Sequence, residues 1–362
     1  MLTPPPEEPP TTPPSNPHEN TSLPIDITQT YNHLLHTDPL LTHPIAAIES
    51  LITLLSTSPA GTISETLALL SSATNTLKTT IPNPIPLSAG TDLFQRYIIS
   101  TLQSRSSSHD HNARGGGKGK RNHYQGGVED FRAIRAHLLA NSRLFVQRAK
   151  EARGKIARVA RKFVRDGSVV MTCGRSRVVA ATLKAAAEEG VRFRVVYAED
   201  SYSYPSSISA GTTGSKTTDV VGELRARGVP VAVIPFAGVA TALGETDFVI
   251  VGAESVVENG GVVSGMGTYQ MGLLAKSAGR PFYVGAESHK FVRVFPLDWG
   301  DLPVRRRGLD FRIEEKERRG VGEGEGEVDV DFTPPELITA IVTENGVQTP
   351  SAVSEELIKI WY

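Results

Sequence analysis

The residues best suited to chemistry lie in short polar segments, each of which directly follows an apolar run. Arg175 and Arg177 follow one run, Glu254 follows another, and Lys290 follows a third. Guanidinium and ammonium groups hold phosphate, and a carboxylate accepts hydrogen bonds from hydroxyl groups. The combination favours a site for a phosphorylated, hydroxyl-bearing ligand, such as a sugar phosphate or a nucleotide.

A glycine-rich turn supplies a second kind of phosphate-binding group. Gly265, Gly267 and Thr268 stand where a helix is predicted to begin, and backbone N–H groups at a helix start can hold a phosphate. Tight turn geometry alone is the competing explanation for these glycines. The pair also resembles the start of a dinucleotide fingerprint, but Gln270 replaces the third glycine, which disfavours a nicotinamide cofactor.

The sequence therefore predicts a ligand site without a metal. Its candidate residues are Arg175, Ser176, Arg177, Glu254, Asn259, Gly265, Gly267, Thr268 and Lys290. For the two arginines and for Lys290, surface ion pairs are the alternative to ligand contact. No cofactor is required, and the single cysteine, Cys173, excludes both an internal disulfide and a multi-cysteine zinc site.

Alternating strands and helices are expected to position these residues. Strands are predicted at 168–172, 193–199, 230–234, 248–251, 281–286 and 337–343, with helices at 178–189, 218–227, 239–243 and 268–278. Strands that are apolar on both faces and alternate with helices indicate a buried parallel sheet. The fold class is therefore α/β, with a Rossmann-like doubly wound sheet whose ligands sit beyond the carboxyl ends of the strands.

The chain before this sheet has the apolar spacing of helices, from about residue 25 to 103 and again from 128 to 165. We predict a disordered tail over 1–22 and a helical N-terminal domain over 23–166 with a flexible insertion at 104–127. The Rossmann-like domain then covers 167–362, with mobile insertions at 201–215 and 314–328.

The composition restricts the partners. A formal net charge of −1 gives no overall attraction to nucleic acid. No apolar run approaches the roughly 20 residues that span a bilayer, and the N-terminus has no secretory signal. The sequence predicts a cytoplasmic protein that binds neither nucleic acid nor membrane. The apolar residues among Leu357, Ile358, Ile360, Trp361 and Tyr362 are expected either to contact another subunit or to pack within their own domain.

Three motifs carry a resemblance to a known family. Residues 249–261, 286–297 and 349–359 resemble, in this order, signature segments of the alpha subunits of eukaryotic translation initiation factor 2B. The resemblance covers about residue 25 to 362 and implies a homodimer formed through the C-terminal domains. That homodimer would bridge copies of an assembly of beta, gamma, delta and epsilon subunits. The assembly exchanges guanine nucleotide on initiation factor 2, and an alpha subunit helps it to sense the phosphorylated alpha subunit of that factor.

The wider superfamily includes sugar-phosphate isomerases, and this chain departs from their catalytic pattern. The resemblance places Gly174 at their catalytic cysteine and Glu254 at their catalytic aspartate, while Cys173 falls one position early. Ser264 and Gly265 replace an Asn-Lys pair of the isomerases. Proton relay needs side chains within hydrogen-bond reach, so we expect a regulatory protein without turnover. An active isomerase and a stand-alone sensor of sugar phosphates or nucleotides remain alternatives.

Overall fold

The computed structural model describes residues 25–38, 41–58, 61–111, 126–199, 216–303, 305–306, 327–328 and 330–361. The predicted tail at 1–22, the insertion at 201–215 and most of the insertion at 314–328 lie outside these residues.

The first part of the chain is helical, as predicted. It comprises α1 (Ile27–Thr37), α2 (His43–Thr57), α3 (Ile63–Thr80), α4 (Pro84–His111) and α5 (Gly126–Ala160). Asp26 caps α1 by accepting from the amides of Thr28 and Gln29, and Thr62 caps α3. Helix α2 lies at the centre, because most of its apolar residues pack in one core with α3 and α4.

Helix α4 is longer than the sequence indicates. Pro84 and Pro86 would break a helix in its interior, but both lie in the first turn of α4, where proline removes no intrahelical hydrogen bond. At its other end α4 continues to His111, and α5 begins at Gly126, so the loop prediction is wrong for the two ends of 104–127. A helix that is already nucleated extends through serines at little cost.

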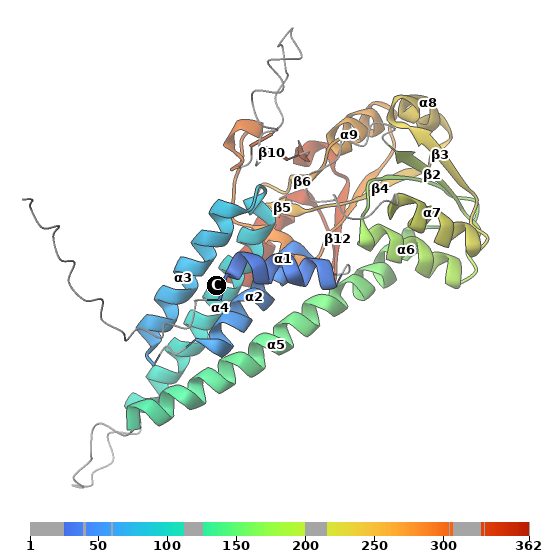
Figure 1. The fold of residues 1–362 in the computed structure, drawn as a ribbon. Helices are drawn as coiled ribbons and strands as arrows, with labels where there is room; N and C mark the ends of the chain where they lie inside the picture. Colours follow the sequence, from blue (N-terminus) through green and yellow to red (C-terminus); the bar gives the residue numbers. More distant parts are fainter. Residues whose placement is uncertain are drawn as a thin grey trace, which may run out of the picture.

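Helix α5 joins the two parts of the molecule. Its middle part packs against the helical core through Val146, whereas Ile156 and Ala160 belong to the core beneath the sheet. Figure 1 shows α5 running along the helical part and ending beside α6. The prediction of one or two long helices over 128–165 is confirmed by this single helix and the 3₁₀ turn that follows it.

A seven-stranded sheet forms the centre of the second part, with strand order β13-β12-β7-β4-β1-β2-β3. Its strands are β1 (Val169–Cys173), β2 (Arg194–Glu199), β3 (Val231–Pro235), β4 (Phe248–Gly252), β7 (Phe282–Gly285), β12 (Ala340–Thr343) and β13 (Gly346–Gln348). All neighbours are parallel except β12 and β13. The predicted parallel sheet is confirmed, and β13 adds an antiparallel edge that was not predicted.

Helices cover both faces of this sheet. They are α6 (Arg177–Glu188), α7 (Lys216–Ala226), α8 (Val239–Ala242), α9 (Thr268–Ser277) and α11 (Val353–Trp361). Along β4, Val249 and Val251 pack with residues of α8 and α9, whereas Ile250 packs with residues of α6 and α7. The alternation follows from the two-residue period of a strand and gives the doubly wound arrangement.

A second sheet was missed by the sequence reasoning. Its order is β11-β6-β5-β8, from β5 (Ser255–Val257), β6 (Val262–Gly265), β8 (Phe291–Val292) and β11 (Val330–Thr333). These strands are too short to show a clear periodicity. Their apolar side chains form a separate core with Ile85 and Ala89 of α4, so this sheet connects the helical part to the main sheet.

Short elements complete the fold. A two-residue pair joins β9 (Arg305–Arg306) and β10 (Glu327–Val328). The 3₁₀ turns are Arg161–Phe163, Phe236–Gly238, Leu243–Glu245, Ser288–Lys290, Trp299–Asp301, Pro335–Leu337 and Pro350–Ala352. In α11, Leu357 is buried in the core of its own domain, whereas Ile358 is exposed.

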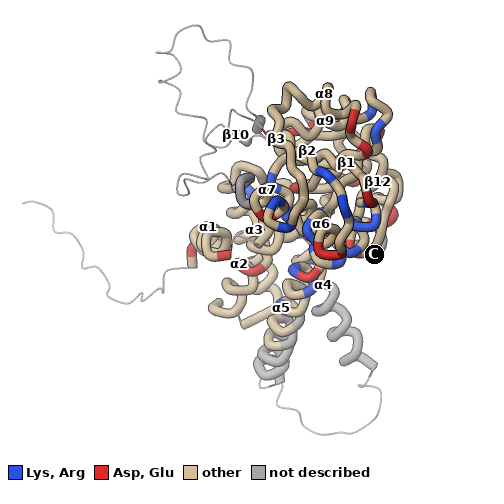
Figure 2. The backbone as a smooth tube through the Cα atoms, turned by 90° about the vertical axis from the view of Figure 1, so that its right-hand side faces the viewer, with Lys and Arg blue, Asp and Glu red and all other residues tan. Residues whose placement is uncertain are grey.

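The charged residues are mixed in sign over the surface. Figure 2 shows basic and acidic positions interspersed around α6, α7 and the neighbouring strands. Among the described residues, no helix is both long and apolar enough to cross a membrane.

Candidate ligand site at the switch point of the sheet

The strand order reverses between β1 and β4, and such a switch point is where open α/β sheets bind ligands. Ser176 follows β1 and caps α6, accepting from the amide of Val179 at 3.3 Å. Gly252 ends β4 directly opposite. A Cβ atom added to Gly252 would lie 2.1 Å from the Ser176 hydroxyl oxygen, so glycine is needed for this close approach.

The two predicted arginines differ in their surroundings. Arg175 is exposed in the turn after β1. Arg177 is partly buried and donates through a guanidinium nitrogen to the carbonyl oxygen of Leu41 at 2.8 Å. Burial, followed by the nearby positive charge of Arg153, lowers the pKa of Arg177. Arg177 therefore connects the switch point to the helical part, and Arg175 is the arginine that is open to solvent.

Glu254 lies just beyond β4 and also contacts the helical part. The side-chain amide of Asn83 donates to its carboxylate at 2.9 Å. Burial raises the pKa of Glu254, although the Lys290 ammonium and the Asn83 amide both act to lower it. Tyr31, which is fully buried, is hydrogen-bonded to Nδ1 of His43 at 2.6 Å, and burial and the charge of Glu254 raise its pKa.

Lys290 is held between two oxygens. Its Nζ donates to the carbonyl oxygen of Ala253 at 2.9 Å and forms an ion pair with Glu287 at 2.8 Å. The Glu287 side chain is only 2% exposed, and Arg153 of α5 lies 3.8 Å from its other oxygen. Burial opposes ionisation of Glu287, but the adjacent Lys290 and His289 outweigh it and lower the pKa to about 2. Glu287 is therefore a buried carboxylate that stays ionised because of the cationic groups beside it.

His289 links the same segment to α2. Its Nε2 lies 3.2 Å from the hydroxyl of Thr42, and both residues are buried. Burial lowers the pKa of His289 to about 4, in spite of the opposing charge of Glu287. His289 is thus neutral near pH 7, as expected for a packed histidine.

The glycine-rich turn at the start of α9 is occupied by a side chain of the protein itself. The carboxylate of Asp331 accepts from the amide of Gly267 at 2.7 Å and from that of Tyr269 at 3.0 Å. Thr268 turns its hydroxyl to the carbonyl oxygen of Gly265 at 2.7 Å. Backbone amides at this helix start were predicted to hold a phosphate. Burial raises the pKa of Asp331 to about 7, although its amide hydrogen bonds act to lower it.

The predicted residues thus fall into separate groups. Ser176, Arg177, Glu254 and Lys290 come together at the switch point. Gly265, Gly267 and Thr268 lie at the start of α9, which Ser264 connects to the switch point by donating to the carbonyl oxygen of Gly252 at 3.0 Å. Asn259 is placed elsewhere, since it accepts from the amide of Gly261 at 2.8 Å and donates to Pro296 at 2.7 Å, which fixes a turn.

Several residues of this region were not predicted. Tyr31, Thr42 and Asn83 reach it from the helical part, and no local pattern marks residues so distant in the sequence. Asp331 did have a signal, because an acidic residue stands between the apolar Val330 and Phe332 of a buried strand. Such a residue must find a partner within the protein.

The positions expected to hold a catalytic thiol cannot supply one. Gly174 has a φ of 67° in the turn after β1, and its carbonyl oxygen accepts from the Tyr197 hydroxyl. The neighbouring Cys173 is buried, and its side chain packs with Met171 and Val251 in the core on the α8 and α9 side. Burial raises its pKa to about 12, which keeps the thiol protonated.

The strand order and the polar switch point define a Rossmann-like α/β protein with a helical N-terminal part that contributes to the site. The initiation factor 2 subunit family model matches residues 36–350, and the chain belongs to this family. In the tetrameric beta–delta complex of eIF2B from Chaetomium thermophilum, one chain superposes with a TM-score of 0.66 at 18% identity, covering 94% of this chain and 96% of that one.

Sequence relatives place the chain more finely. It is 30% identical over 335 residues to the eIF2B subunit alpha of Caenorhabditis elegans, covering 92% of this chain and 98% of the relative. It is 38% identical over 242 residues to the same subunit of Dictyostelium discoideum, covering 64% and 71%. It is also 31% identical over 224 residues to a ribose 1,5-bisphosphate isomerase of Archaeoglobus fulgidus, covering 61% and 67%. The chain is therefore eIF2B alpha-like, within a superfamily that includes isomerases.

Proposed function

We propose that the chain is the non-catalytic, regulatory alpha-type subunit of the cytoplasmic complex that exchanges guanine nucleotide on translation initiation factor 2. In this proposal it forms a homodimer that bridges the beta, gamma, delta and epsilon subunits, and it helps the complex to respond to the phosphorylated alpha subunit of the factor. The likeness to eIF2B alpha subunits over most of the chain supports the assignment.

One observation carries the absence of catalysis. The resemblance to the isomerases assigns Gly174 to the position of their catalytic thiol. Gly174 has no side chain, and Cys173 beside it is buried with a raised pKa. Glu254, at the position of their aspartate, is already hydrogen-bonded to Asn83. A proton relay needs a second group within reach of the carboxylate, and neither Gly174 nor Cys173 supplies the thiol for it.

Reconstitution tests the regulatory role. Nucleotide exchange on initiation factor 2 would be measured with the beta, gamma, delta and epsilon subunits, with and without this chain, and with and without the phosphorylated factor. We expect this chain to be needed for full inhibition by the phosphorylated factor. Equal inhibition in its absence would refute the proposal, as would a monomer in light scattering at micromolar concentration.

A direct assay tests the absence of turnover. Incubation with ribose 1,5-bisphosphate and with methylthioribose 1-phosphate should give no ketose product. Turnover that disappears in Glu254→Gln would show that the carboxylate still works as a base and would refute this part of the proposal.

A second role, binding of a sugar phosphate or a nucleotide without turnover, is favoured by the cations at the switch point. Arg175 is exposed there, and Arg177 and Lys290 lie on neighbouring segments. A bound ligand stabilises the fold by mass action, so it should raise the melting temperature. We expect ribose 5-phosphate or AMP to raise it for the wild type and not for Arg175→Ala, while unphosphorylated ribose does nothing. An equal rise in the variant would remove Arg175 from the site.

A further inference from the structure

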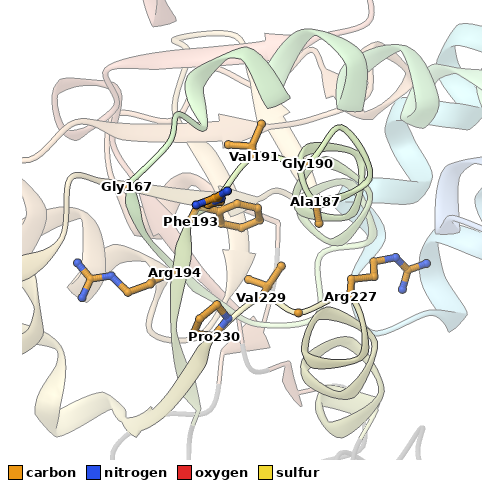
Figure 3. Close-up of a pocket in the computed structure, with 11 residues that line it drawn as sticks. Gly167, Ala187, Gly190, Val191, Phe193, Arg194, Arg227, Val229 and Pro230 are labelled. Carbon is orange, nitrogen blue, oxygen red and sulfur yellow. The ribbon is translucent and has the colours of Figure 1, made fainter.

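A hollow of about 430 Å³ lies at the amino ends of β1, β2 and β3, at the opposite edge of the sheet from the switch point (Figure 3). Its apolar lining includes Ala187, Val191, Phe193, Val229 and Pro230. Phe193 and Val229 are buried and belong to the core of the domain, so the hollow has a fixed apolar floor.

Backbone hydrogen bonds hold the walls of this hollow in place. Three backbone amides donate to backbone carbonyl oxygens here: Gly167 to Arg192 at 2.7 Å, Arg194 to Ser168 at 2.8 Å, and Val195 to Pro230 at 2.9 Å. The hollow is thus preformed, and a ligand would bind without first paying to order these turns.

Three arginines surround the apolar floor, and no acidic residue lines the hollow. Arg227 is 3.5 Å from Glu188 and is partly neutralised. Arg192 and Arg194 are exposed, and neither side chain has an ion pair among the residues that the structure describes.

The nearby carboxylates have other partners. Asp166 accepts from the backbone amide of Arg192 at 2.8 Å, and Glu189 pairs with Arg161. Figure 3 shows Arg194 and Arg227 extending outward on opposite sides of the hollow. The charges of Arg194 and Arg227 therefore flank the apolar floor on opposite sides.

We propose that this hollow is a docking site for a segment of a partner protein that carries an apolar side chain between carboxylates. The apolar side chain would fill the floor, and the flanking carboxylates would meet Arg194 on one side and Arg227 on the other. A small anion would need the cations to converge, whereas an extended segment suits cations that lie apart. This surface is separate from the switch point, so the proposal does not depend on a ligand there.

Fluorescence anisotropy with a labelled synthetic peptide tests the proposal on the full chain. The peptide contains one leucine with two glutamates on each side. A matched peptide replaces the leucine with serine, and another replaces the glutamates with lysines. We expect saturable binding of the first peptide, and at least about tenfold weaker binding of each of the others, because apolar burial and charge pairing both contribute.

Two protein variants locate the binding. The double variant Arg194→Glu with Arg227→Glu should weaken binding about tenfold or more, because both proposed pairs are lost and repulsion is added. Arg148→Glu, an exposed charge reversal on α5, should leave binding unchanged. Both substitutions are at exposed positions and should leave the melting temperature within a few degrees.

Three results would overturn the proposal. The first is no saturable binding of the leucine peptide at millimolar concentration. The second is equal binding by the double variant or by the lysine peptide. The third is full displacement of the peptide by inorganic phosphate at a concentration at which chloride has no effect, because it would assign the arginines to a small-anion site.

Discussion

Replacing Lys290 with methionine tests the account of the buried carboxylate at the switch point. The substitution keeps most of the apolar length of the side chain and removes its positive charge. Glu287 would then stay buried at 2% exposure, and the more distant Arg153, at 3.8 Å, would be its remaining ion-pair partner among the described residues. We expect a large loss of stability at pH 7, because the carboxylate must remain ionised without its main cation or take up a proton.

The pKa of Glu287 gives the magnitude. It is lowered from an ordinary value of 4.5 to about 2, and this difference corresponds to about 3 kcal/mol of stabilisation of the ionised form. Breaking a buried ion pair by removing one partner typically costs 3–5 kcal/mol, so about 3–4 kcal/mol is expected here. The lost hydrogen bond to the carbonyl oxygen of Ala253 contributes part of this loss.

Urea denaturation monitored by circular dichroism measures the effect against a matched control. Lys78 pairs with Asp92 at 2.7 Å, which is nearly the same distance, but the side chains are 30% and 38% exposed. Lys78→Met should cost about 1 kcal/mol or less, because an exposed pair is weak. Lys290→Arg keeps the charge and should recover much of the stability that Lys290→Met loses.

The dependence on pH separates lost charge pairing from lost packing. A carboxylate with a lowered pKa contributes stability above its unfolded pKa, and this contribution disappears as the pH falls through the folded value. The gap between wild type and Lys290→Met should therefore narrow as the pH falls from 7 to 4, because Glu287 in the variant takes up a proton more readily. A loss no larger than that of Lys78→Met, or a gap that does not change with pH, would refute the reasoning.

Three further predictions concern neighbouring residues. Gly252→Ala should destabilise the chain by about 1–3 kcal/mol through its clash with the α6 cap, whereas Gly222→Ala, in open space within α7, should stabilise it by up to about 1 kcal/mol; thermal melts would show the opposite signs. For Asp331, whose folded pKa of about 7 exceeds its ordinary 3.8, the stabilisation is complete below 3.8 and lost as the pH rises through 7. Wild type should therefore lose stability relative to Asp331→Asn between pH 4 and 7, by at most about 4 kcal/mol, and a flat difference in urea midpoint would contradict this. Asn83→Ala should cost about 1–3 kcal/mol by leaving the Glu254 carboxylate without its amide donor, and a loss that Glu254→Gln does not reduce in a double-mutant cycle would argue against that contact.

Local patterns predicted the main sheet well because its strands are apolar on both faces. Val249 and Ile250 are neighbours in β4 and pack into the two cores on opposite faces of the sheet. A strand that is buried on both faces needs a continuous apolar run, which is visible in the sequence. The strands of the second sheet are two to four residues long, and β11 carries the acidic Asp331 at its centre. Strands this short and a strand with an acidic centre give no periodic signal. The second sheet therefore depends on pairing between distant segments, which local patterns do not reveal.

The residues of the candidate site that follow strand ends were predicted, and those that come from other parts of the chain were missed. Ser176 and Glu254 follow neighbouring parallel strands, so topology alone brings them together. Asn83 reaches Glu254 from a helical part that begins far away in the sequence. Backbone amides at the start of α9 were predicted to hold a phosphate, but those of Gly267 and Tyr269 donate to the side chain of Asp331, which pairing between distant strands brings there.

The long helix α5 has a consequence for how the chain loses its structure. Ile156 and Ala160 near its end are fully buried beneath the sheet, while Val146 lies in the helical core, and the helix between them has no break. A fragment that begins at residue 167 would lack the two buried side chains that α5 adds to the core beneath α6 and α7, and a fragment that ends there would expose the last turns of the helix. Melting of either half should therefore propagate along α5 into the other, and the two halves should behave as one cooperative unit.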